Sequence, residues 1–183
     1  MTIYTAIDTE TTGFGTDDRV VEIACVTFSL DVEKPLAIYH TIVDPGADAK
    51  MNPEAEKVHG ISLERARKYG AKHYQVMAGM LTVIGREVIG HNIEFDVRMI
   101  NQTLLGGFCF DRWSNKKPKH CTQKMAKKQL PGPPMGAVKG WWRLGNICER
   151  YGIDSSGWHS ALDDAIMTMH LFRKLKGVSF GKS

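Results

Sequence analysis

The sequence predicts one α/β domain built on a mixed sheet, and three observations carry this prediction. The length of 183 residues fits one domain with a buried core. Three β-prone segments come first, and the short connections between them favour antiparallel pairing. Strands and helices then alternate, which is the pattern of an α/β protein. We expect a single domain over residues 1–183, with a basic, Pro/Gly-rich segment inserted at residues 106–143.

Short runs rich in Val, Ile and aromatic residues predict the strands. The expected strands are residues 3–7, 20–28, 37–43 and 88–90. Capping residues and apolar spacing predict the helices, including one that begins at Asn52-Pro53 and one that Asn92 caps. The remaining predicted helices begin near residue 62 or cover residues 74–84, 122–129, 144–151 and 160–176.

Composition excludes several classes of protein. The apolar fraction of 43% and the charged fraction of 24% are those of an ordinary globular protein and argue against disorder or a coiled coil. Membrane spans and a signal peptide are not expected, because no apolar run approaches about 20 residues. The widely spaced cysteines predict neither a zinc site nor a disulfide scaffold but reduced thiols in a cytoplasmic protein: Cys25, Cys109, Cys121 and Cys148.

The net charge of +4 conceals two opposed parts of the chain. Residues 111–143 carry nine Lys/Arg and one Asp, a net charge of +8, while the other 150 residues carry −4. A basic segment on an acidic body predicts a polyanionic partner, and the alternative is a solvated loop. Trp141 and Trp142, next to Arg143, are candidates for stacking on unpaired bases.

Two carboxylates follow the first predicted strand, and a third lies on an apolar helix face. Asp8 and Glu10 are two residues apart, so both side chains point to the same side of an extended chain. Asp96 falls on the same helix face as Ile93 and Ile100. A carboxylate in that position is costly unless it is paired, hydrogen-bonded or bound to a metal.

The last predicted helix repeats this pattern. Asp164 shares an apolar face with Ala161, whereas Asp163 points about 100° away and fits a capping pair with Ser160. His159 stands just before the helix. Carboxylate oxygens favour Mg²⁺ or Mn²⁺ over zinc, and a histidine beside them suits acid–base work near neutral pH. We therefore expect the carboxylates and His159 to share one site.

These residues also carry a family resemblance. Residues 7–13 (IDTETTG), 91–96 (HNIEFD) and 159–164 (HSALDD) resemble the three motifs of the DEDD exonucleases. The third has the His-x-Ala-x-x-Asp form of the histidine-bearing subclass. Residues 58–61, 121–132 and 144–153 resemble further segments of that group, and the nearest branches are exonuclease X and the epsilon proofreading subunit of bacterial replicative polymerases.

The resemblance implies a ribonuclease H-like fold, with a mixed five-stranded sheet whose first three strands are antiparallel and which helices flank. It implies hydrolysis of DNA from the 3′ end with release of nucleoside 5′-monophosphates. It also implies two Mg²⁺ ions, with Mn²⁺ able to substitute, held by Asp8, Glu10, Asp96 and Asp164, and His159 as general base.

The expected partner is a nucleic acid with a free 3′ end, and single-stranded DNA is the first candidate. No membrane partner is expected. The expected substrate contacts come from Thr11, Thr12, Gly13, Phe14, His59 and Asn92, with a core position as the alternative for Phe14. An RNA substrate stays open, because the 2′-hydroxyl contacts that distinguish RNA cannot be read from the sequence. Polymerase association, a homodimer, and an idle nucleic-acid-binding subunit stay open as well.

Overall fold

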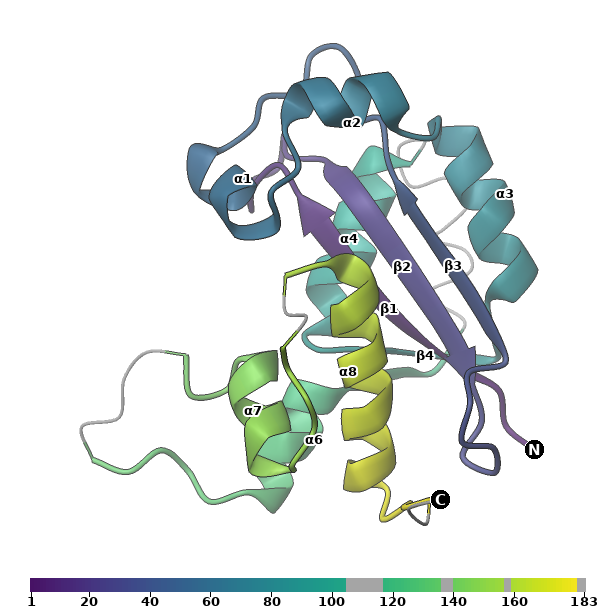
Figure 1. Cartoon of the computed structure of the whole chain (residues 1–183), viewed down its shortest axis with the longest axis vertical. Coiled ribbons are helices and arrows are strands. Elements are labelled where there is room, and N and C mark those ends of the chain that lie inside the picture. The colour runs from purple at the N-terminus through teal and green to yellow at the C-terminus, as the bar shows by residue number, and fades with distance from the viewer. Residues whose placement is uncertain (105–116, 136–139, 157–158, 181–183) are drawn as a thin grey trace.

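Figure 1 shows a computed structural model of the chain, which describes residues 1–104, 117–135, 140–156 and 159–180. These residues form a five-stranded sheet in the order β3-β2-β1-β4-β5. The first three strands, β1 (Tyr4–Thr11), β2 (Val20–Phe28) and β3 (Ala37–Ile42), pair antiparallel. The last two, β4 (Glu87–Gly90) and β5 (Lys119–Cys121), run parallel to β1 and to each other. The predicted mixed sheet is confirmed.

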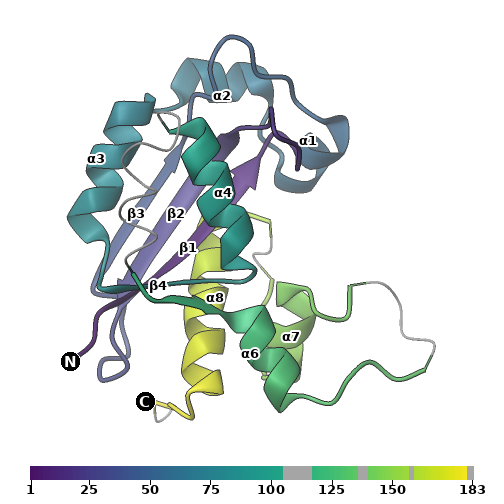
Figure 2. The same cartoon turned by 180° about the vertical axis from the view of Figure 1, so that it is seen from behind.

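Helices cover both faces of the sheet. The final helix, α8 (Ala161–Leu175), packs on one face, and α3 (His73–Val83) and α4 (Ile93–Thr103) pack on the other (Figures 1 and 2). The short helices α1 (Pro53–His59) and α2 (Leu63–Tyr69) lie beyond one end of the strands. Two more, α6 (Thr122–Gln129) and α7 (Leu144–Arg150), pack beside α8.

The alternation along β1 decides where its carboxylates point. Ile7 packs with the residues under α3 and α4, whereas Ala6 packs with the residues under α8. Successive side chains of a strand point to opposite faces, so Asp8 and Glu10 continue the series of Ala6. Both carboxylates therefore face α8, where Asp164 lies.

The structure departs from the predicted elements at three places. The first strand continues to Thr11, so Asp8 and Glu10 lie within β1 rather than after it. The fifth strand, β5, lies within the basic, Pro/Gly-rich segment, where no strand was predicted; its three residues are too few to show a period. Asn92 occupies the N-cap position of α4, but its side chain makes no capping hydrogen bond. That part of the prediction is wrong, because the backbone of Asn92 is left-handed, with φ 78°.

Three cysteines, Cys25, Cys121 and Cys148, are buried and free of disulfides; Cys109 lies outside the described residues. Among the residues that the structure describes, no helix is both long and apolar enough to span a membrane.

Candidate active site

Three carboxylates meet where β1 ends against the first turn of α8. Asp8, Glu10 and Asp164 each place one oxygen within 4.8 Å of the others. The Oδ1 atom of Asp164 is buried and has no hydrogen-bond partner. A buried oxygen of this kind is costly unless something binds it. An all-oxygen donor set with an unsatisfied ligand atom fits a hard divalent cation.

Burial and mutual repulsion keep protons on this cluster when no cation is present. Burial, followed by the neighbouring carboxylates of Asp96, Asp164, Glu10 and Glu22, raises the pKa of Asp8 well above its usual value. Burial and then Asp164 raise the pKa of Glu10 to about 8. Burial also raises the pKa of Asp164 to about 7, although a backbone hydrogen bond from His159 acts against the shift. A cation would therefore bind in competition with protons.

Asp96 lies next to this cluster, on α4. Its side chain is 3% exposed, and its Oδ1 accepts a hydrogen bond of 2.9 Å from the hydroxyl of Thr9. Burial raises the pKa of Asp96 to about 7, and the hydrogen bond from Thr9 limits that rise. The charge of Asp96 also raises the pKa of Asp8. Thr9 points away from Asp8 and Glu10, toward α4, so its hydrogen bond fixes Asp96 from the opposite face of the sheet.

His159 directly precedes α8 and is exposed. Its φ of 84° is rare for a residue other than glycine, and such backbone strain is concentrated at functional sites. Partial burial, and then the charge of Arg143, lower the pKa of His159 below its usual value. The backbone of His159 contacts Asp164, and a neutral imidazole can accept a proton near neutral pH.

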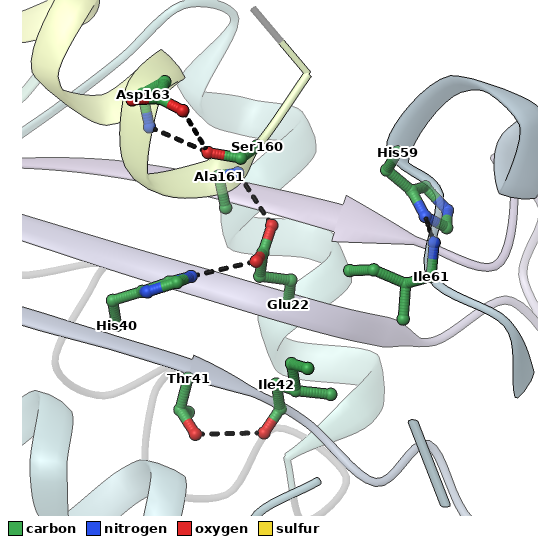
Figure 3. Close-up of polar contacts among 9 residues, drawn as sticks. All are labelled: Glu22, His40, Thr41, Ile42, His59, Ile61, Ser160, Ala161 and Asp163. Carbon is green, nitrogen blue, oxygen red and sulfur yellow. Dashed lines mark hydrogen bonds and ion pairs between the residues drawn. The ribbon is translucent and has the colours of Figure 1, made fainter. Parts of the chain in front are cut away.

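Asp163 takes the helix-capping role that its spacing predicts. The Ser160 hydroxyl accepts a hydrogen bond from the backbone N–H of Asp163 and donates one of 2.7 Å to its Oδ2 (Figure 3). Asp163 is not part of the group that Asp8, Glu10 and Asp164 form. The two adjacent aspartates therefore serve different parts of the structure.

The exonuclease family model matches residues 5–172, most of the chain and all of the carboxylates described above. The chain belongs to the exonuclease family. One relative is the DNA polymerase III epsilon subunit of Treponema pallidum, which is 30% identical over 92% of this chain and 74% of its own length. Another is the epsilon subunit of Aquifex aeolicus, which is 30% identical over 94% of this chain and 79% of its own length. The ribonuclease T of Yersinia enterocolitica is 27% identical over 92% of this chain and 82% of its own.

Solved structures place this exonuclease in the ribonuclease H-like fold. E. coli exonuclease I in complex with a dA16 oligonucleotide superposes with a TM-score of 0.76 at 19% identity. The match covers 98% of this chain and 42% of exonuclease I, so the chain spans about two fifths of that protein. The family and its relatives identify the chain as a DEDD-type 3′→5′ exonuclease, an enzyme class that needs divalent metal ions.

In this exonuclease, the last residue of β1 and the turn that follows carry four of the predicted substrate contacts. Thr11 donates its hydroxyl hydrogen to the carbonyl of Gly13, and Thr12 donates to Asp18 at 2.7 Å. A Cβ at Gly13 would lie 2.6 Å from the Asp18 carboxylate and would push it away from its hydrogen-bond donors, Thr12 and Gly15. Phe14 is 76% exposed, so the alternative of a core position is excluded, and its ring lies 5.7 Å from that of Phe95.

The two remaining predicted contacts lie in different surroundings. His59 uses both ring nitrogens within the chain: Nδ1 accepts from the N–H of Ile61, so in the neutral ring Nε2 carries the proton and faces the carbonyl of Thr11 at 3.3 Å. Asn92 is exposed. His59 thus supports the strand end that carries Glu10.

The basic segment divides into lysines held by the fold and lysines that reach the surface. Lys117 donates to the carbonyl of Gly85, and Lys119 pairs with Glu94 at 3.6 Å. The exposed lysines of this segment lie on α6: Lys124, Lys127 and Lys128. Residues 111–116 and 136–139 lie outside the described residues.

The two tryptophans are half-buried, and cations cover their rings. Arg150 lies 3.8 Å from the ring centre of Trp141, and Lys127 lies 5.8 Å from that of Trp142. The carbonyl of Trp142 accepts a hydrogen bond from His91 at 2.8 Å. His91 lies between β4 and α4, so this contact joins the tryptophan pair to the start of the helix that carries Asp96.

The sequence analysis missed Thr9 and Glu22. Thr9 stands between two recognised carboxylates and gives no separate signal. Glu22 is 7% exposed and is the one charged residue of β2, whose nine residues are otherwise apolar except for Thr27. A single acidic residue within an apolar strand is costly to bury, and this pattern could have identified Glu22 from the sequence.

Proposed function

We propose that this exonuclease removes nucleoside 5′-monophosphates from the 3′ end of single-stranded DNA, using two divalent ions, Mg²⁺ in the first place. The observation that carries this proposal is the group formed by Asp8, Glu10 and Asp164, with one buried carboxylate oxygen left without a partner. Asp8, Glu10 and Asp164 would hold metal directly, and Asp96 would complete the site from α4. Mn²⁺, with the same preference for oxygen ligands, should substitute.

Bound divalent ions would supply positive charge for the scissile phosphate and acidify the attacking water. His159 would take the proton of that water onto a ring nitrogen while the water oxygen bonds to phosphorus. The bond between phosphorus and the 3′ oxygen of the preceding nucleotide breaks, and that oxygen keeps the electron pair and takes a proton from water to become the new 3′-hydroxyl. The terminal nucleotide leaves with its 5′ phosphate. The lowered pKa of His159 keeps the imidazole in its proton-accepting form near neutral pH.

The names of the relatives favour DNA and leave RNA as the second candidate. The epsilon relatives are named as subunits of a DNA polymerase, and exonuclease I is bound to a DNA oligonucleotide. The relative named ribonuclease T is the observation that favours RNA. We propose DNA as the principal substrate. Association with a polymerase would follow the epsilon relatives, and a homodimer is the other assembly to test.

A labelled-end assay tests the proposed function. A 5′-labelled single strand should shorten stepwise from its 3′ end in Mg²⁺ or Mn²⁺ and stay intact with a chelator. Matched RNA of the same sequence should shorten more slowly. A strand that stays full-length with either metal, while the protein still binds it, would establish the idle binding subunit instead.

Phe14 should stack on the terminal base of the substrate. Its exposed ring follows the turn after Glu10, and Arg98 holds the Phe14 carbonyl at 3.1 Å. Phe14→Ala should weaken DNA binding by about 1–3 kcal/mol, the contribution of one base–aromatic stack. Fluorescence anisotropy with a labelled strand and Ca²⁺ in place of Mg²⁺ measures this. Tyr74→Ala, which removes another exposed ring, on α3, is the control, and equal affinities for both variants would exclude the stack.

We propose that the exposed lysines of α6 hold the phosphate backbone that leads to the site. Lys124, Lys127 and Lys128 are exposed, and among the described residues none of them forms the kind of carboxylate pair that engages Lys119; Lys127 also donates to Gln123 at 3.2 Å. Lys117 and Lys119 contribute less, because the carbonyl of Gly85 and the carboxylate of Glu94 already bind their ammonium groups. Contacts to phosphate release counterions, so the contribution of α6 should weaken as salt rises.

A further inference from the structure

Glu22 is a buried carboxylate that the proposed mechanism does not use. It lies in β2 directly opposite Glu10 of β1, and its side chain is 9% exposed. Residues opposite each other in an antiparallel pair point to the same face, so Glu22 also faces α8. Placing a fifth carboxylate beside four others is unfavourable, because like charges repel. Other contacts of Glu22 must therefore offset this repulsion.

Both oxygens of Glu22 are bound by the chain itself. Oε2 accepts a hydrogen bond of 2.8 Å from the backbone N–H of Ala161, and Oε1 lies 2.9 Å from Nε2 of His40 on β3 (Figure 3). Ala161 is the first residue of α8, and its N–H is one of those that a helix cannot satisfy internally. A carboxylate at a helix N-terminus also interacts favourably with the helix dipole.

These contacts connect the start of α8 to the sheet. The hydrogen bonds between Ser160 and Asp163 close within the first turn of the helix, so they cap it without fixing its place on the sheet. Glu22 instead reaches from β2 to Ala161, three residues before Asp164. One helical turn has 3.6 residues, so Asp164 lies about one turn from this anchor.

We propose that Glu22 is a positioning residue, which holds Asp164 at its distance from Asp8 and Glu10, and that it is not a further metal ligand. The proposal rests on the proposed function for the role of that cluster as a metal site. The geometry supports it, because Ala161 and His40 already occupy the two oxygens of Glu22.

Two substitutions separate the effect of the length of the Glu22 side chain from the effect of its charge. Glu22→Gln keeps the length of the side chain and an oxygen for Ala161 but removes the charge. Glu22→Asp keeps the charge but is one methylene shorter, so it cannot span from β2 to Ala161 without movement of α8. A positioning role predicts damage from Glu22→Asp and rescue by Glu22→Gln, whereas a ligand role predicts the reverse. Glu64→Asp, at an exposed position of α2, is the matched control.

The readouts need no substrate. Electron paramagnetic resonance of free Mn²⁺ gives the metal affinity, and hydrogen exchange of the metal-free protein gives the protection of residues 161–164. Glu22→Asp should weaken Mn²⁺ binding by about 10-fold or more, the effect of losing an outer-shell contact. It should also speed exchange in the first turn of α8, while exchange in Glu22→Gln and Glu64→Asp should stay close to that of the unaltered protein.

Mn²⁺ binding weakened as much in Glu22→Gln as in Asp164→Asn, which removes a proposed direct ligand, would overturn the proposal, and so would unchanged binding and exchange in Glu22→Asp. If Glu22→Asp does not fold, the result for Glu22→Gln still decides between the positioning and ligand roles. A different set of results would contradict the proposed function and leave the role of Glu22 in place. The unaltered protein would bind Mn²⁺, and the two variants would differ as described, but labelled DNA would stay intact.

Discussion

Replacing Asp164 with asparagine should lower exonuclease activity more than about 100-fold, beyond the range of an outer-shell metal contact. Asp163→Asn should leave most of the activity in place. The two residues are adjacent and chemically identical, but Asp164 joins the group formed by Asp8 and Glu10 while Asp163 bonds Ser160. Asparagine keeps the volume of Asp164 and removes the charge that a divalent cation requires. Steady-state rates on a labelled single strand in Mg²⁺ measure the difference.

The same substitution should stabilise the protein when metal is absent. Asp164 is one of several partly or fully buried carboxylates that repel one another, and its pKa is raised to about 7. Removing its charge relieves that repulsion near pH 8. A gain of about 1 kcal/mol would raise Tm by roughly 2–4 °C for a chain of this size. Asp163→Asn serves as the control for stability as well. A lower Tm for Asp164→Asn in chelator, or loss of activity in Asp163→Asn alone, would contradict this assignment.

The sequence predicts the site well where two simple periodicities apply. Asp8 and Glu10 share a face because strand side chains alternate, and the structure places both toward α8. Asp164 and Asp163 separate because a helix turns about 100° per residue. Asp96 falls on a buried helix face and is 3% exposed. These inferences needed only the order of residues within one element.

The sequence fails where a contact depends on how two elements are placed. The role of Glu22 follows from its position opposite Glu10 and from the location of Ala161 above it, which neither β2 nor α8 shows alone. The strand β5 forms because its backbone pairs with β4, and three residues carry no pattern of their own. Phe14 could belong to the core or the surface until the turn around Asp18 places it outside.

Divalent metal should stabilise this exonuclease much more at pH 8 than at pH 6. Asp8, Glu10, Asp96 and Asp164 have raised pKa values in the folded protein, about 8 for Glu10 and about 7 for Asp96 and Asp164. In the unfolded chain, such groups titrate near pH 4. The protons held by the folded cluster therefore contribute stability that is fully present below about pH 4. This contribution is lost as the pH rises through about 7 to 8, so the metal-free protein should weaken over that range.

A bound cation replaces those protons and reverses the trend. Each proton that metal binding displaces makes the apparent affinity rise about 10-fold per pH unit below the pKa of the group. The increase in Tm on adding Mg²⁺ or Mn²⁺ should therefore be small at pH 6 and large at pH 8. Thermal unfolding in chelator and in metal over this range measures it. Asp164→Asn should lose most of the metal-dependent increase. An equal increase at both pH values would show that the cation binds somewhere other than this protonated carboxylate cluster.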